Sequence, residues 1–173
     1  MATGWRVRRA RRSDSKQFLG LVKALADFEH LTPPSRAAGL RMYAAVFDRR
    51  SLKLLVAESG GRLVGYALFY FTYSSFLARP TLYLEDLFVL PERRSEGIGR
   101  ALFLSCVGEA VGGGCGRMEW SVLNWNSNAI RFYERMGARM LSEWSVFRLD
   151  AKALGMLESK RTAKPNQTPI GPS

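Results

Sequence analysis

Two adjacent carboxylates stand in an otherwise apolar run and are the first residues that could do chemistry. The run extends from Leu82 to Leu90, is typical of a buried strand, and contains Glu85 and Asp86. Neighbouring side chains of a strand point to opposite faces, so we expect at most one of the two to face a core and the other to face a cleft. A carboxylate in a cleft can accept a proton or attract a cation. The run therefore indicates acid-base chemistry or cation binding.

A glycine-containing turn follows this strand. Pro91 ends the strand because it has no N–H, and Arg94-Ser-Glu-Gly97-Ile-Gly99 leads into a helical pattern. Glycines let a ligand approach the backbone, and a helix N-terminus favours negative charge, so the turn could cradle a phosphate. The spacing is neither a Walker A loop nor the three-glycine dinucleotide fingerprint. A tight turn without a ligand is the alternative.

The charge of the chain is strongly positive. Among its 173 residues, 26 are Lys or Arg and 15 are Asp or Glu, giving a formal net charge of +11. Such a balance is found in nucleic-acid-binding proteins, but the arginines here are scattered, with local concentrations only at residues 6–12 and 160–164. A polyanionic cofactor would also be steered by a positive field. We therefore do not expect nucleic acid to be the partner.

Several other classes of site are disfavoured by the composition. The two cysteines, Cys106 and Cys115, do not make a disulfide framework or a zinc site, and the single histidine, His30, argues against a multi-histidine metal centre or a Ser-His-Asp triad. We expect no bound metal. No apolar run approaches the roughly 20 residues that span a bilayer, and residues 1–9 lack the apolar core of a secretory signal. The expectation is a cytoplasmic protein without a membrane segment.

The remaining pattern predicts one α/β domain over residues 1–159. Strands are expected at 5–10, 52–58, 63–73, 82–90 and 117–123, with one or two more within 140–149, and helices at 13–30, 35–47, 99–111, 128–136 and 152–159. This order fits a mixed sheet with helices on both faces. Residues 160–173 are polar and proline-rich, which is typical of a disordered tail.

Taken together, several motifs resemble the GNAT superfamily of N-acetyltransferases, and within it the spermidine/spermine acetyltransferase family. The matching segments are the loop Arg94–Gly99, Tyr70-Phe-Thr-Tyr73, Tyr83-Leu-Glu-Asp-Leu-Phe-Val89, Leu25-Ala-Asp-Phe-Glu29, and Asn124 to Ala138 with its Tyr and Gly-Ala. The residues from Val122 to Asn126 are more similar to the thialysine-acetylating branch than to the polyamine branch. The resemblance covers residues 5 to 150 and implies the GNAT fold, with a mostly antiparallel central sheet.

This resemblance also implies an activity. Its members transfer acetyl from acetyl-CoA to a primary amine of a small cationic substrate, such as a diamine, a polyamine or thialysine, by direct attack and as homodimers. Glu85 would be the general base and Tyr133 the general acid at the sulfur. Each has a structural alternative, because Glu85 could pair with an arginine and Tyr133 could be a core aromatic. The rival activities are acetylation of a protein amine or amino acid, and a non-catalytic acyl-CoA or nucleic-acid-binding module.

Binding residues follow from the same resemblance. The cofactor would be held by Leu87, Phe88 and Val89, by Arg94, Ser95, Glu96, Gly97, Ile98, Gly99 and Arg100, and by Asn126, Ser127, Asn128 and Tyr133; the amine would be bound by Phe28, Glu29, Glu85, Asp86 and Glu143. Two departures stand out. Ser95 replaces the first glycine of the family loop, and Glu143 lies in a segment shorter than its counterpart. Asn126 could also be a plain helix cap.

Overall fold

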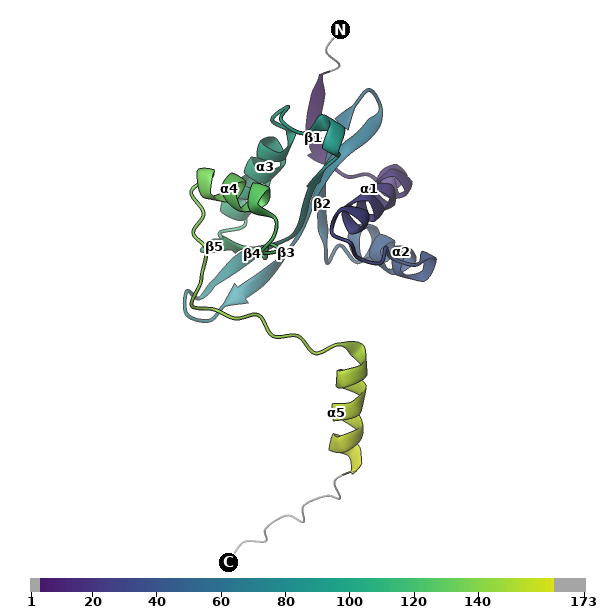
Figure 1. The fold of residues 1–173 in the computed structure, drawn as a ribbon, viewed down its shortest axis with the longest axis vertical. Coiled ribbons are helices and arrows are strands. Elements are labelled where there is room, and N and C mark those ends of the chain that lie inside the picture. Colours follow the sequence, from purple (N-terminus) through teal and green to yellow (C-terminus); the bar gives the residue numbers. More distant parts are fainter. Residues whose placement is uncertain (1–3, 164–173) are drawn as a thin grey trace, which may run out of the picture. The chain divides into compact units, whose positions relative to one another are not determined.

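A five-stranded sheet forms the centre of the first of two compact units, Met1–Leu123 and Asn124–Ser173, in a computed structural model that describes residues 4–163. The strands lie in chain order: β1 (Trp5–Arg9), β2 (Lys53–Ser59), β3 (Arg62–Ser74), β4 (Arg79–Val89) and β5 (Arg117–Glu119). All neighbours are antiparallel except β4 and β5 (Figure 1). The mixed, mostly antiparallel sheet is confirmed.

Helices cover both faces of this sheet. The first unit contains α1 (Ser15–Phe28), α2 (Arg36–Tyr43) and α3 (Ile98–Gly112), with short helical turns η1 (Arg12–Asp14), η2 (Ala44–Asp48) and η3 (Pro91–Arg93). Helices α1 and α2 lie on one side and α3 on the other (Figure 1). On the α1 side, Phe18 packs against Tyr66, with ring centroids 5.2 Å apart. On the other side α3 approaches so closely that a Cβ on Gly65 would lie 3.3 Å from Leu102 Cδ1.

The second unit contains α4 (Ser127–Arg135) and α5 (Ala151–Ala163). The strands expected within residues 140–149 are absent from this described segment, so that prediction was wrong. Trp144 and Phe147 there are 73% and 93% exposed, because an apolar run becomes a strand only where another strand pairs with it. Helix α5 continues to Ala163, beyond residue 160, where a tail was expected to begin; residues 164–173 lie outside the described part of the chain.

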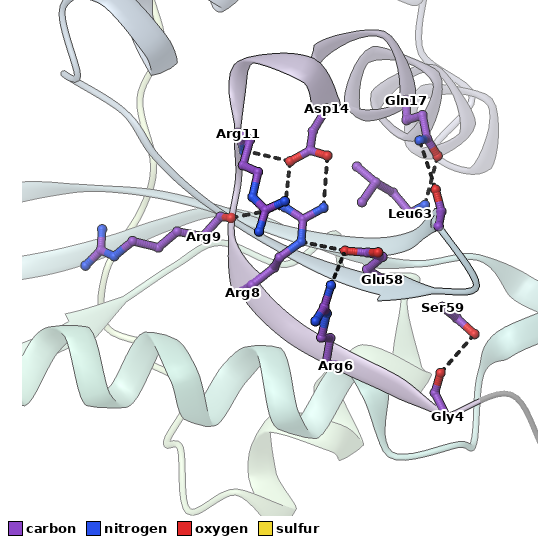
Figure 2. Close-up of polar contacts among 11 residues, drawn as sticks. Gly4, Arg6, Arg8, Arg9, Arg11, Asp14, Gln17, Glu58, Ser59 and Leu63 are labelled. Atoms are coloured by element: carbon purple, nitrogen blue, oxygen red, sulfur yellow. Dashed lines mark hydrogen bonds and ion pairs between the residues drawn. The ribbon is translucent and has the colours of Figure 1, made fainter.

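An arginine network anchors the start of α1 to the sheet. Arg8 of β1 donates hydrogen bonds to Asp14 at 2.7 and 3.0 Å and to Glu58 of β2 at 2.6 Å (Figure 2). Asp14 is the N-cap residue of α1, but its carboxylate accepts from Arg8 and from the Arg11 N–H instead of bonding the helix. Farther along α1, Gln17 accepts a 2.9 Å hydrogen bond from the Leu63 N–H. These contacts hold α1 against β1, β2 and β3.

Local contacts define the start of α2 and the turn between β2 and β3. Ser35 caps α2 and accepts a 3.2 Å hydrogen bond from the Ala38 N–H. Gly60 and Gly61 adopt positive φ in the β2–β3 hairpin turn, which favours glycine. Strand β5 is shorter than expected, since it ends at Glu119 and not at residue 123. No helix within residues 4–163 combines the length and apolarity needed to span a membrane.

Candidate active site

A β-bulge in β4 determines where the two adjacent carboxylates point. Asp86 lies opposite Leu68 of β3, whereas Leu84 lies opposite Phe69, so Glu85 is an extra residue without a partner in this register. Because Leu68 and Phe69 face opposite sides, the alternation of β4 is broken at Glu85. The regular alternation, on which the expectation of opposite faces for Glu85 and Asp86 rested, is therefore interrupted between them. A bulge re-aims the side chain that it inserts.

Both carboxylates lie near the α1 side of the sheet. The Tyr66 hydroxyl donates a 3.1 Å hydrogen bond to Asp86, and Tyr66 belongs to the core beneath α1. Burial is the main cause that raises the pKa of Asp86 and of two tyrosines on that face of β3, Tyr66 and Tyr70, and the negative charge of Glu85 acts in the same direction on all three. Glu29, just after α1, acts on Asp86 in the same direction. The bulge and the end of α1 thus bring three acidic residues together.

This acidic cluster, defined as Glu29, Glu85 and Asp86, has unusual electrostatics for so basic a chain. Burial raises the pKa of Asp86 to about 6 and also raises the pKa of Glu29. Within residues 4–163 none of the three carboxylates forms an ion pair, although eight other acidic residues do. The alternative in which Glu85 pairs with an arginine is therefore not observed. Clustered unpaired acids attract an external cation.

The phosphate-cradle turn lies between η3 and α3. Gly97 at the N-cap of α3 has φ 83° and Ser95 has φ 67°, so both residues adopt the left-handed conformation. The first N–H groups of α3, at Ile98, Gly99 and Arg100, have no acceptor within the helix and carry the positive end of its dipole. This arrangement fits the pyrophosphate of a coenzyme A molecule. The cost is at Ser95, because a serine adopts this conformation less readily than the glycine of the family loop.

An open strand edge lies beside that turn. Strand β4 pairs with β5 only over Thr81 to Tyr83, and within the described residues no strand pairs with that edge from Leu84 to Val89. Unpaired backbone groups on such an edge can hydrogen-bond the amides of an extended ligand. The segment includes Leu87, Phe88 and Val89, which the sequence predicts to contact the pantetheine. The edge therefore fits the amide-bearing arm of coenzyme A.

Arg94 contacts two aromatic rings. One belongs to Phe28, which the sequence predicts to bind the amine, and the other to Phe88, which it predicts to bind the cofactor. Its guanidinium carbon lies 4.7 Å from the centroid of the Phe28 ring and 5.9 Å from that of Phe88. Its Nε donates a 3.2 Å hydrogen bond to the Val89 carbonyl oxygen. Nearby, Arg93 forms an ion pair with Glu96 at 2.6 Å, whereas Arg94 and Arg100 form no ion pair within residues 4–163.

The predicted residues of the second unit have local roles of their own. Asn126 caps α4, its side-chain oxygen accepting a 3.2 Å hydrogen bond from the Ala129 N–H, while Ser127 is the first residue of that helix. Asn128 accepts a 2.6 Å hydrogen bond from Arg131. Tyr133 is half-buried on α4, with its ring centroid 5.1 Å from that of Phe132. Glu143 forms an exposed ion pair with Arg139 at 3.6 Å.

Sequence reasoning missed Tyr66 as a site residue. Tyr66 was counted only as part of an apolar run, yet its hydroxyl reaches Asp86, twenty residues away. The available signal was the strand period, which places Tyr66, Leu68 and Tyr70 on one face of β3. A buried tyrosine hydroxyl also needs a hydrogen-bond partner, and a carboxylate in the adjacent run could supply it.

Comparisons with known proteins identify the family of this chain. The sequence profile of the Acetyltransferase (GNAT) family matches residues 19–138. Thialysine N-epsilon-acetyltransferase of Mus musculus is 33% identical over 167 residues, covering 90% of this chain and 98% of that protein. The L-ornithine N5-acetyltransferase of Arabidopsis thaliana is 43% identical over 96 residues, 56% of this chain and 42% of that protein.

Solved structures support the same fold. The aminoglycoside N-acetyltransferase AAC(6')-Iy in complex with CoA superposes with a TM-score of 0.73 at 19% identity, covering 87% of this chain and 97% of that one. At such identity the likeness concerns the fold alone. The match to the family profile spans more than half of the sequence and therefore shows the family as well as the fold. The chain belongs to the Acetyltransferase (GNAT) family and is an N-acetyltransferase that uses acetyl-CoA as its acetyl donor.

Proposed function

We propose that the chain acetylates a primary amine of a small cationic substrate, such as a diamine or a lysine analogue like thialysine. The observation that carries this proposal is the acidic cluster. Glu29, Glu85 and Asp86 form no ion pair within the described residues, in a chain with a net charge of +11. A substrate with an ammonium group supplies the missing countercharge. The names of the thialysine and ornithine relatives support the same class of acceptor.

The bulged position of Glu85 suits it to act as the general base. A lysine-like ammonium has a pKa of about 10.4 and must lose a proton before it can attack. Glu85 is exposed at the strand surface and can accept that proton, directly or through one water, while Asp86 and Glu29 hold the substrate. Bound acetyl-CoA supplies an acetyl group activated as a thioester. Tyr133 would give its proton to the sulfur that leaves.

Transfer would be direct, without an acetylated enzyme. Burial raises the pKa of Cys106 to about 12, so its sulfur stays protonated and poorly nucleophilic at neutral pH. The pKa of Cys115 is raised as well, again chiefly by burial. Neither thiol is activated for an acyl-enzyme. The amine nitrogen would therefore attack the acetyl carbon of the thioester directly and lose a proton to Glu85, and the thiol of coenzyme A would leave with the proton that Tyr133 gives.

A panel of acceptors tests the proposal. Purified protein with acetyl-CoA would be assayed for thiol release with thialysine, L-ornithine, lysine, short diamines, spermidine and lysine-containing peptides. We expect the small dicationic amines to be the best acceptors by kcat/KM. Greater activity with peptides would favour the rival assignment to a protein amine. Turnover of monoamines equal to that of dicationic amines would contradict the role of the acidic cluster.

We also propose that the protein works as a homodimer. Support comes from the second unit, where Trp144, Val146 and Phe147 are 73%, 81% and 93% exposed and form an apolar surface that a second copy could cover. Light scattering should then report about twice the chain mass of 19.4 kDa. A monomer at micromolar concentration would contradict the proposal.

A further inference from the structure

The hydrogen bond between Tyr66 and Asp86 connects the protein core to the acidic cluster. Tyr66 is fully buried, and its ring is fixed by Phe18 at 5.2 Å and by Phe88 at 6.2 Å between centroids. Its hydroxyl therefore has little freedom and points to Asp86 Oδ2 at 3.1 Å. A phenylalanine would fill almost the same volume. The main role of the hydroxyl is thus to hydrogen-bond the carboxylate and not to fill space in the core.

Among the described residues, no other group stabilises the charge of Asp86. Glu29 beyond the end of α1 and Glu85 on β4 are the charged groups that act on it, and both are negative. Arg94 stacks on the neighbouring Phe88 but forms no ion pair with Asp86. Within residues 4–163 the Tyr66 hydroxyl is thus the one hydrogen-bond donor to this carboxylate. Burial and two like charges favour the protonated form, and only this donor opposes them.

We propose that Tyr66 is a positioning residue, which keeps Asp86 ionised and aimed so that it can bind the ammonium group of the substrate. The proposal rests on the proposed function, in which the acidic cluster binds a cationic amine. It deepens that function by adding regulation by pH. Amine binding would strengthen as the pH rises from mildly acidic to neutral, because Asp86 gains its charge in that range. Tyr66 would set where this change occurs.

The direction of the effect follows from the hydrogen bond. Burial raises the pKa of Asp86 to about 6, and the Tyr66 hydroxyl lowers it. Removing the hydroxyl should therefore move the titration of Asp86 to higher pH. A hydrogen bond to a charged group is strong enough to shift the midpoint by about one pH unit or more. The substrate ammonium, with a pKa of about 10.4, stays charged throughout this range, so the change belongs to the protein.

The experiment compares Tyr66→Phe with Tyr73→Phe. Tyr73 lies on the same strand and is 68% exposed, so it controls for the loss of a tyrosine hydroxyl on β3. Thialysine binding to enzyme saturated with CoA would be measured by calorimetry from pH 5 to 8.5. Without an acetyl group no turnover occurs, so proton transfer by Glu85 does not enter. In parallel, carbon NMR would follow the Asp86 carboxyl signal in the unliganded protein.

For wild type and Tyr73→Phe we expect thialysine binding about tenfold weaker at pH 5 than at pH 7.5, with a midpoint near pH 6. For Tyr66→Phe the midpoint of binding and of the Asp86 signal should both rise by about one pH unit, and the affinities should converge at pH 8.5. A Tyr66→Phe protein whose Asp86 signal titrates as in wild type would overturn the proposal. So would a loss of affinity that is equal at every pH, because it would indicate a merely structural role.

A second variant keeps the test informative should Tyr66→Phe fold poorly. Asp86→Asn retains Tyr66 and removes the titration of Asp86, so thialysine binding should be weak and should lose its midpoint near pH 6. Burial also raises the pKa of Glu29, so the double variant Glu29→Gln/Asp86→Asn removes this second source of pH dependence. A binding midpoint near pH 6 that persists in the double variant would overturn the inference. The proposed substrate class and the coupling between Tyr66 and Asp86 can be contradicted separately. If wild type binds no amine while Asp86 still titrates near pH 6 and responds to Tyr66→Phe, the proposed substrate class is wrong and the Tyr66–Asp86 coupling stands.

Discussion

Phe28 and Arg94, 66 positions apart in the sequence, lie in contact, with the guanidinium carbon of Arg94 4.7 Å from the centroid of the Phe28 ring. Phe28 ends α1 beside the acidic cluster, and Arg94 begins the phosphate-cradle turn. Stacking of this kind holds a guanidinium in place without neutralising its charge. The contact therefore joins the segment proposed to bind the amine to the segment proposed to bind the cofactor.

Replacing Arg94 with alanine should weaken acetyl-CoA binding about tenfold, which corresponds to about 1.4 kcal/mol for one lost charge-assisted contact to a phosphate. Calorimetry in the presence of EDTA measures this, since the turn should bind the pyrophosphate without a divalent ion. Arg93→Ala is the matched control, because Arg93 is already paired with Glu96. Equal losses in the two variants would assign the effect to net charge and not to Arg94.

Ser95→Gly should stabilise the protein. Ser95 has φ 67°, where a residue with a side chain is strained by roughly 1–2 kcal/mol, and the greater freedom of glycine in the unfolded chain offsets part of the gain. We expect the free energy of unfolding in urea to rise by about 0.5–1 kcal/mol. Ser105→Gly, in the interior of α3, is the control and should lower it. A decrease for Ser95→Gly would contradict the strain.

Arg8→Met should destabilise the first unit. It removes the guanidinium that forms an ion pair with Asp14, and the side chains of Arg8 and Asp14 are only 16% and 8% exposed. We expect a loss of about 2 kcal/mol in the free energy of unfolding, below the roughly 3–5 kcal/mol for a fully buried pair. Arg12→Met removes an exposed pair with Asp48 and should cost much less. Similar losses for both variants would mean that the network of Figure 2 adds no specific stability.

Local sequence signals were enough to predict most of the sheet and the glycine-containing turn before α3. Residues that favour strands form the apolar runs of β2, β3 and β4. Glycines, which adopt positive φ readily, form the Gly60-Gly61 hairpin and the turn before α3. They place the carboxylates of β4 next to the start of a helix. One continuous stretch of sequence, from β4 to the start of α3, therefore contains both the carboxylates and the turn of the candidate site.

The features that could not be predicted depend on pairing between distant segments. The bulge at Glu85 exists only in the register of β4 against β3, and the hydroxyl of Tyr66 finds Asp86 only once that register is set. Residues 140–149 show the converse, since their apolar pattern predicts a strand but no pairing partner makes one within the described residues. The periodicity of a sequence shows which face of a strand is apolar. It does not show which other segment pairs with that strand.

Asp86→Asn should stabilise the protein at neutral pH while impairing it as an enzyme. The folded state raises the pKa of Asp86 from 3.8 to about 6, so the folded protein binds a proton that the unfolded chain has already lost between these values. Stability contributed by this group therefore falls as the pH rises from about 4 to 6, and the penalty is complete above pH 6. Asparagine avoids the penalty.

We expect a gain of about 1–3 kcal/mol in the free energy of unfolding at pH 7.5 and a much smaller gain at pH 4. Urea titrations at the two pH values measure it. Asp27→Asn, a change of an exposed carboxylate near the end of α1, is the control and should be almost neutral at both. A gain from Asp86→Asn that does not depend on pH would show that it arises from packing and not from ionisation.

Glu85→Gln should separate the base from the residues that bind the amine. Glutamine keeps the shape of the side chain but cannot accept a proton, and one general base typically contributes about 10²–10⁴-fold to the rate. We expect kcat to fall within this range at pH 7, where a lysine-like amine is almost wholly charged, and to recover in part as the pH rises and free amine becomes available. Glu92→Gln, at an exposed carboxylate on η3, is the matched control.

Tyr133→Phe should behave differently from Glu85→Gln. Removing the hydroxyl leaves acetyl-CoA binding within a few-fold of wild type while turnover falls, and a higher pH should not rescue it, because the departing sulfur still lacks its proton donor. A thioester with a more acidic leaving thiol should narrow the deficit. The measurement is a pH–rate profile of both variants beside wild type, with acetyl-CoA affinity determined separately. Wild-type activity of Glu85→Gln at pH 7 would refute the base, and a loss of affinity equal to the loss of turnover in Tyr133→Phe would make Tyr133 a binding residue.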